Sequence, residues 1–354
     1  ASAAVALSEV ALDGRRRRAL AWVLVLGAAL EGVLALSQFR AQGAVGLGIL
    51  GESPFGAFTP GTAKFIVGVS RAVRAYGTFP HPNILGAFLL MGLAAAYYLW
   101  FSIRIPRFSV TRESRLAMLR AYAPVLFKTI ALSILLFTVF LGILLTFSRA
   151  AWALAVFISL VSVFSFFIPR SSRRSACKLL IVFTSIFSLL FFIFSPFIFP
   201  RAHVSLSEPS VTERISSHAI GLRMVKEHPF GVGIGNQVMI AVADGSYRRS
   251  GTLAPSLWQP VHNMYVLVAV ETGVLGLAAF VALLGYLLWS SVRAVGRSST
   301  LAFSVVAPLT LSAFLAFALF DHFFWTIEQG RLLFWLAVGI VMATNRARSS
   351  TDRT

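Results

Sequence analysis

Runs of about 20 apolar residues recur along the whole chain and limit the folds it can adopt more than any other feature. A helix of that length crosses the hydrocarbon core of a bilayer, where every backbone polar group must find its partner inside the protein. We predict about eight spans, at residues 19–37, 83–101, 124–146, 150–168, 179–200, 262–290, 302–320 and 332–344, the last of which is short. We therefore predict an all-α, polytopic membrane protein, with residues 1–354 forming a single integral membrane domain.

Composition agrees with a membrane protein and excludes other classes. The chain is 57% hydrophobic and 12% charged, whereas a soluble domain carries about 25% charged residues. The single cysteine, Cys177, excludes a disulfide framework within the chain. A net charge of +18 would suggest nucleic acid in a soluble protein. Here the arrangement of the basic loops accounts for most of it, so we expect membrane lipids and no nucleic acid as partners.

Basic residues alternate with the predicted spans and orient the chain. More than half of the Lys and Arg residues lie in five segments, at 15–18, 102–124, 170–178, 293–297 and the tail after 345. The positive-inside rule places these segments, and both termini, in the cytoplasm. The intervals at 38–80, 147–150, 201–261 and 321–331 then face the outside of the cytoplasmic (inner) membrane. Any site built on them faces the periplasm or the exterior.

Two of these outer intervals are long enough to carry structure of their own. Residues 38–80 are rich in Gly and Pro, and we expect a short re-entrant or interfacial helix there. Residues 201–261 form the longest polar interval, with a capping-box pattern at Ser210 and Glu213. From there we predict an amphipathic helix over 210–228 that lies on or near the membrane. Its predicted apolar face carries Val211, Ile215, Leu222 and Val225.

Three arginines of the outer intervals are candidates for binding an anion. Arg149 lies in a tight hairpin between two spans, where a cation departs from the positive-inside trend. Arg214 and Arg223 are nine residues apart, and therefore on opposite sides of the predicted helix. Both cannot point at one small ligand, so we favour Arg214 for a phosphate and keep Arg223 as a secondary candidate. Each arginine has an alternative role as an anchor to lipid headgroups.

His262 begins the run at 262–290 and is the candidate base. A helix N-terminus disfavours a protonated imidazole, so we expect a neutral His262 able to accept a proton. The alternative is an ordinary interfacial histidine. The glycines of FGVGIGN, which are Gly231, Gly233 and Gly235, can present backbone N–H groups to an anion, or can simply form a bend.

Four further ionisable residues lie in or beside the predicted spans and count as functional hypotheses by default. They are Glu31, Glu271, Asp321 and His322. No His or carboxylate spacing in the sequence resembles a metal-binding motif. We therefore expect neither a metal nor another cofactor.

Taken together, several segments resemble the O-antigen ligase and polymerase superfamily. They are FSRAAW at 147–152, HPFGVGIGN at 228–236 and HNMYVLVAVETGVLG at 262–276, with FPHPNILGAFL at 79–89. His262 followed by ten residues and then Gly273 is similar to the H-x10-G pattern of the ligases. The resemblance extends from about Gly77 to the last span. Ala153 stands where the ligase arginine motif R-x3-L has Leu.

This resemblance implies a GT-C-like membrane glycosyltransferase that works without a metal. Such an enzyme moves a glycan from an undecaprenyl diphosphate carrier to a saccharide or lipid A-core acceptor. Arg149 and Arg214 would contact the diphosphate, and His262 would act at the acceptor hydroxyl or at the leaving diphosphate. The substrate-binding residues would be Arg223, Asn263, Gly233, Gly235, His81 and Asn83. We expect Arg149, Arg214 and His262 to converge on one extracytoplasmic cavity.

Three alternatives stay open at this stage. A polymerase of polysaccharide repeat units would use the same motifs. A small-solute or bicarbonate-type transporter would use Glu31 and Glu271 along a pathway, although no internal repeat supports it. A scaffold subunit of a polysaccharide export complex would need none of these residues for chemistry. The chain begins at Ala1 without a signal-peptide layout and has fewer spans than the family usually has, which is consistent with missing N-terminal helices.

Overall fold

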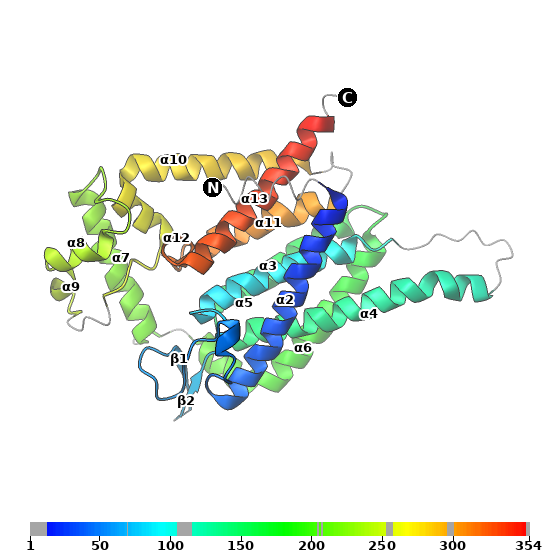
Figure 1. Ribbon diagram of the computed structural model, residues 1–354, viewed down its shortest axis with the longest axis horizontal. Helices are drawn as coiled ribbons and strands as arrows, with labels where there is room; N and C mark the ends of the chain where they lie inside the picture. Colours follow the sequence, from blue (N-terminus) through cyan, green and yellow to red (C-terminus); the bar gives the residue numbers. More distant parts are fainter. Residues whose placement is uncertain are drawn as a thin grey trace.

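The computed structural model describes residues 13–68, 70–104, 115–203, 205–206, 208–252, 258–295 and 301–351, and these are overwhelmingly helical (Figure 1). The long helices are α2 (Gly14–Ala41), α3 (Pro82–Phe101), α4 (Arg115–Leu145), α5 (Arg149–Phe167), α6 (Arg173–Ala202), α10 (Met264–Ala294), α11 (Leu301–Phe317) and α13 (Glu328–Thr351). The predicted all-α, multi-pass class is confirmed. Parts of the basic segments, at 105–114, 296–300 and 352–354, lie outside the described residues.

Six of the predicted spans correspond to helices that are long and apolar enough to cross a membrane. Within the described residues these are α2, α3, α4, α5, α6 and α10. The predicted span at 302–320 is a shorter apolar helix, α11. The predicted span at 332–344 lies inside α13, which begins earlier, at Glu328, and extends to Thr351. The run is therefore not a separate short helix.

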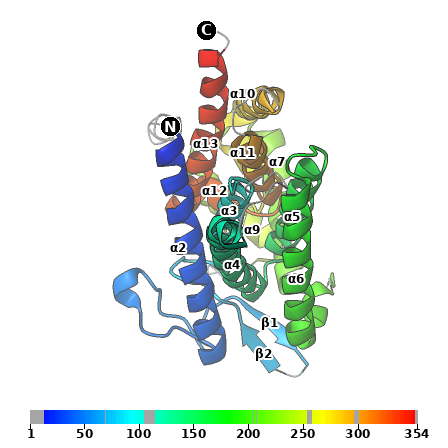
Figure 2. The ribbon, with the colours of Figure 1, turned by 90° about the vertical axis from the view of Figure 1, so that its right-hand side faces the viewer.

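Helix α3 is the centre of the bundle. Almost every residue of α3 is buried, and in Figure 2 it lies between α2 on one side and α5 and α6 on the other. Small residues let α2, α3 and α4 approach closely, as is usual between membrane helices. A Cβ added to Gly92 would lie 2.2 Å from the Cβ of Ala28, and one added to Gly32 would lie 2.1 Å from the carbonyl oxygen of Thr138. Larger side chains at these glycines would force the helices apart.

Residues 38–80 form a hairpin where we expected a short helix. Strand β1 (Lys64–Val67) pairs antiparallel with β2 (Ser70–Val73), and between the end of α2 and β1 the described chain makes one helical turn, the 3-10 helix η1 (Gly48–Leu50). Two side chains of α2 form hydrogen bonds with the segment that leads from the hairpin back to α3. The Gln38 amide bonds with the backbone of Tyr76 and Gly77 at 2.7–3.0 Å, and the Glu31 carboxylate accepts two hydrogen bonds from Thr78. The Glu31 carboxylate therefore fixes this loop.

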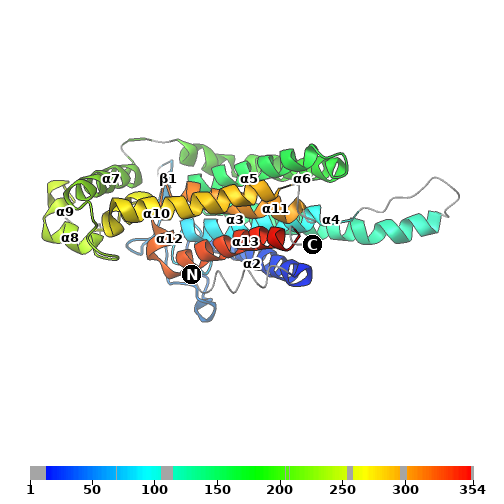
Figure 3. The ribbon, with the colours of Figure 1, turned by 90° about the horizontal axis from the view of Figure 1, so that it is seen from above.

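The long polar interval folds into three helices, α7 (Pro209–Glu227), α8 (Gln237–Ala243) and α9 (Ser246–Arg249). They gather at one end of the molecule, at the left of Figures 1 and 3. The predicted capping box is wrong, because α7 begins at Pro209 and its N-cap is Glu208. Proline suits the first helical position, where the missing N–H has no partner to lose.

The face of α7 that packs on the protein differs from the apolar face we predicted. Ile220 and Met224 are buried against α8 and α10, whereas Ile215 and Leu222 are about half exposed. The sequence located the helix, and of the predicted apolar face Val225 packs against this cluster, whereas Ile215 and Leu222 do not. Gly221 also lies at the contact between α7 and the protein, with the side chains of Val261 and Val266 packed directly over it.

Candidate active site

The first component of the site is a break in α10 that explains the spacing between His262 and Gly273. Gly273 has φ 77° and ψ 173°, a conformation open essentially only to glycine. The segment after α7 enters the break. Val232 and Gly233 donate to the carbonyls of Val270 and Glu271 at 2.9 and 3.0 Å, and Val274 donates to the Pro229 carbonyl. The run predicted as one continuous span therefore consists of two helical pieces that meet at Gly273, where this segment bonds to both of them.

The turn between α4 and α5 presents Arg149. Phe147 adopts φ 46°, an uncommon backbone conformation for a bulky residue, and its ring is buried against Phe65 and Phe39. Ser148 then caps α5 through its hydroxyl, which accepts from the Ala151 amide. Arg149 is left as the first residue of α5, at the end of the bundle where α7 begins.

Glu208 joins Arg149 to a second arginine, Arg201 at the end of α6. The Glu208 carboxylate lies 2.9 Å from Arg149 and 2.7 Å from Arg201, and it accepts from the Ser210 hydroxyl at 2.7 Å. Burial opposes ionisation of Glu208, but these donors outweigh it and lower its pKa to about 2. Arg201 also donates to the carbonyl of Phe147 at 2.9 Å. Both guanidinium groups are thus held in fixed positions.

A third arginine, Arg74, is buried at the head of a polar chain. It donates to the carbonyl of Thr146 and to the Asn83 side chain, each at 2.7 Å. Asn83 in turn donates to Asp321 at 2.6 Å. Burial and the charges of Arg201 and Arg214 lower the pKa of Arg74 to about 9, which leaves it protonated at neutral pH. The chain ties the hairpin, the start of α3 and the loop after α11 into one unit.

Three histidines surround Asp321. The rings of His262 and His322 are 5.2 Å apart and nearly perpendicular, and His322 bonds to Thr326 of the short helix α12 (Phe323–Thr326) at 2.7 Å. His81 caps α3, because its Nδ1 accepts from the Asn83 amide at 3.1 Å. Burial and the charge of Arg74 lower the pKa of His81 to about 3. The cluster is therefore neutral histidines around one carboxylate.

His262 is the histidine with an unused nitrogen in a buried position. Its Nδ1 is buried and no described residue bonds to it. Burial is the largest influence on His262; together with the neighbouring His322 and Arg214 it outweighs the effect of Asp321 and lowers the pKa to about 4. A neutral imidazole follows, as expected, although burial rather than the helix N-terminus is the main cause. It can accept a proton at neutral pH.

Arg214 links the arginine group to the histidine group. Its charge acts on His262, on Arg74 and on Arg201, so it lies within electrostatic range of all three. Its Nε is buried and has no hydrogen-bond partner among the described residues. Arg149 reaches the same neighbourhood through Arg201 and Glu208. Arg149, Arg214 and His262 are therefore linked to one another through electrostatic neighbours.

The remaining predicted residues have structural duties in this conformation. Asn263 caps α10, where its side-chain oxygen accepts from Tyr265 and Val266, and its amide donates to the Leu319 carbonyl. The Gly233 amide is taken by Glu271 and cannot also face an anion. Gly235 has φ 83° in the same bend. Arg223 has a buried, unpartnered Nε and lies 4.0 Å from Glu227 in a half-exposed pair.

Sequence reasoning missed Arg74, Arg201 and Glu208. The two arginines share the signal that singled out Arg149, since each is a cation in a segment assigned to the outer side. Glu271, a functional hypothesis of the sequence, instead accepts a hydrogen bond from the Trp325 indole at 2.7 Å and holds α10 against α12. Within the described residues, no group of three or more His, Cys, Asp or Glu side chains is arranged to hold a metal ion.

These observations define a class: a multi-pass helical membrane protein with a fixed group of arginines beside neutral histidines at one end of its bundle. The family model described as O-antigen ligase matches residues 134–281. This part of the chain is therefore similar to the O-antigen ligase family, in agreement with the resemblance seen in the motifs, and the match supports an O-antigen ligase or polymerase type of function in general. The matched region contains Arg149, Arg201, Arg214 and His262. No curated protein matches the chain.

Proposed function

We propose that the protein transfers a glycan from an undecaprenyl diphosphate carrier to a saccharide acceptor at the outer face of the cytoplasmic membrane, as an O-antigen ligase does. The observation that supports the proposal is that Arg74, Arg149, Arg201 and Arg214 are electrostatic neighbours of one another. Glu208 and Asp321 offset part of that charge, and the balance stays positive. A diphosphate is the doubly charged group that such a cluster suits.

The chemistry assigned to these residues is a single displacement. The acceptor oxygen forms the new glycosidic bond at the anomeric carbon, and the bond from that carbon to the diphosphate oxygen breaks. The electron pair leaves with the diphosphate, whose charge is stabilised by Arg149 and Arg214 in the role a divalent metal has elsewhere. His262, which is unprotonated at neutral pH because burial lowers its pKa to about 4, takes the acceptor proton.

Asp321 is well placed to support the base. Burial would raise its pKa, but His322, His81, His262 and the hydrogen bond from Asn83 outweigh burial, so its pKa is lowered. The carboxylate stays ionised and would stabilise a His262 that has gained the acceptor proton. The pairing resembles the way a buried carboxylate supports a catalytic imidazole in hydrolases.

The same site would serve a polymerase, in which the acceptor is the end of another lipid-linked repeat unit. No observation in the structure separates the two, and we place ligase first on the H-x10-G match. A transporter fits less well. Glu31 is bonded to Thr78 and Glu271 to Trp325, so neither carboxylate is free to line a pathway.

The test is glycan transfer in membranes by variants that insert and accumulate normally. We expect His262→Ala to lower the rate about 1000-fold, within the range for losing a general base. We expect Arg214→Ala to lower it about 100-fold, within the range for losing one fixed donor to developing charge. His228→Ala and Arg248→Ala, which alter the same residue types on α7 and α9, should keep the wild-type rate. Wild-type rates in the first two variants would refute the site.

A further inference from the structure

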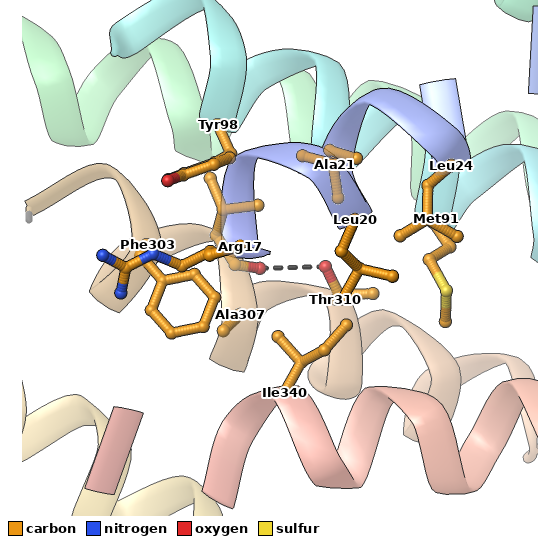
Figure 4. Close-up of a pocket in the computed structure, with 13 residues that line it drawn as sticks. Arg17, Leu20, Ala21, Leu24, Met91, Tyr98, Phe303, Ala307, Thr310 and Ile340 are labelled. Atoms are coloured by element: carbon orange, nitrogen blue, oxygen red, sulfur yellow. Dashed lines mark hydrogen bonds between the residues drawn. The ribbon is translucent and has the colours of Figure 1, made fainter. Parts of the chain in front are cut away.

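A groove at the opposite end of the bundle from α7–α9 has the shape and polarity of an amphiphile. It lies where α2, α3, α11 and α13 meet. Figure 4 shows Arg17, Tyr98 and Phe303 together at one end of it, and Leu24 and Met91 at the other. From Arg17 to Leu24 the groove follows two turns of α2, which is about 10 Å. One end is therefore cationic and the rest is apolar.

The described residues that line the apolar part of the groove offer no polar group that still needs a hydrogen-bond partner. Alanines from three helices, among them Ala21, Ala94 and Ala307, form its wall and keep it open. Thr310 also lines it, but the Thr310 hydroxyl already donates to the Val306 carbonyl at 2.9 Å. Water gains nothing in such a space, whereas a hydrocarbon chain fits it.

Among the described residues, no carboxylate is paired with the arginine at the cationic end. The guanidinium of Arg17 stands 4.5 Å from the Phe303 ring centre, and its Nε is buried without a hydrogen-bond partner among the described residues. Arg17 also lies in the first turn of α2, which contains no acidic residue. A helix N-terminus carries partial positive charge, so arginines there are unfavourable unless an anion offsets them. The Asp13 carboxylate caps α2 by accepting from the Arg15 amide and lies 3.9 Å from the exposed Arg16, and the Arg17 guanidinium makes no ion pair with it.

We propose that this groove binds one anionic phospholipid, with the headgroup phosphate on Arg17 and an acyl chain along the apolar wall. A phosphate would accept from the unused Nε of Arg17, which is the pairing that arginine geometry favours. The acyl chain would fill the space between α2 and the pair α11 and α13. This site is separate from the arginine and histidine groups of the active site, and it does not depend on the glycan substrate.

Native mass spectrometry of the purified full chain, titrated with phosphatidylglycerol, tests the proposal. We expect Arg17→Gln to weaken binding of the first lipid about tenfold, the effect of losing one charge-assisted hydrogen bond. Arg16→Gln is the matched control, because it removes the same charge from the same turn but outside the groove, and it should change affinity less than twofold. Equal losses in both variants would mean general attraction between the basic turn and the lipid, and would overturn the proposal.

Two further measurements separate a lipid site from a phosphate site. The deacylated headgroup, glycerophosphoglycerol, and inorganic phosphate should not compete with phosphatidylglycerol, because neither fills the groove. Ala307→Phe, which fills the groove, should weaken the lipid about as much as Arg17→Gln. Competition by either free anion, or full lipid affinity in a folded Ala307→Phe variant, would overturn the proposal. The headgroup competition needs no variant, so the test holds even if Ala307→Phe fails to fold.

Discussion

The two ends of the bundle use arginine in opposite ways. At the end where α2 begins, Arg15, Arg16 and Arg18 are exposed, and Arg16 makes only a loose contact with Asp13. At the end that carries α7–α9, Arg74 and Arg201 are buried and bonded to carbonyls and side chains. The first group has the role that the positive-inside rule predicts, which is orientation of the chain in the membrane, and charge alone suffices for it. The second is fixed in place, and that is what a group acting on developing charge needs.

Backbone regularity follows the same division. The half of α10 after Gly273 is regular helix, whereas at Gly273 itself the helix is broken and the 229–233 segment bonds to the backbone on both sides of the break. At the site end the turn at Phe147, the break at Gly273 and the hairpin all depart from helix. Each departure is covered by specific hydrogen bonds, as non-helical backbone near a membrane requires. The irregular end is therefore where single substitutions should cost most.

Replacing one arginine at each end is the strongest test of this comparison. Arg201→Gln should lower the free energy of unfolding by about 3 kcal/mol, because it breaks a buried ion pair and leaves the Phe147 carbonyl without its donor. Arg18→Gln, its control in the exposed turn of α2, should change stability by less than about 0.5 kcal/mol. Thermal unfolding in detergent measures both. Similar midpoints for the two variants would remove the distinction between the ends.

The two halves of α10 give the next test, with one glycine in each. Gly273→Ala should destabilise the protein by about 2–3 kcal/mol, because alanine disfavours φ 77° and its Cβ would lie 2.6 Å from the Phe230 carbonyl carbon. Gly285→Ala lies in regular helix with nothing within 4 Å. There alanine should be neutral or slightly stabilising. An unaffected unfolding midpoint in Gly273→Ala would show that the break is not required.

The pH profile of transfer gives the smallest effect and probes the base directly. The pKa of His262 is lowered to about 4, so the neutral form persists down to about pH 5. We expect kcat/KM to be flat from neutral pH to about 5 and to fall about tenfold per unit below 4, as the base becomes protonated. Recovery of activity on return to neutral pH controls for unfolding. A fall centred near 6.5 would indicate an unperturbed histidine instead.

Local chemistry made several features of this protein predictable. The spans follow from apolar length, because a bilayer accepts a single helix of about 20 residues and little else. Arg149 stood out as a cation in a segment that the positive-inside rule predicts to lie outside. The pairing of His262 with Gly273 could be read as a motif, although its reason, a glycine-only break in α10, could not.

The sequence by itself determined the class of fold, the long helices and the residue types of the site, because these depend on hydrophobic length and on charge placement along the chain. Tertiary structure alone decided which arginines share one neighbourhood. Arg74, Arg201 and Glu208 are far apart in sequence from His262 and Asp321, and no periodicity relates them. They lie together because burying a charge costs much free energy unless another element supplies a hydrogen-bonding or oppositely charged partner. That partner, such as Glu208 for Arg201 or Asn83 for Arg74, is a property of the packed bundle and not of either segment.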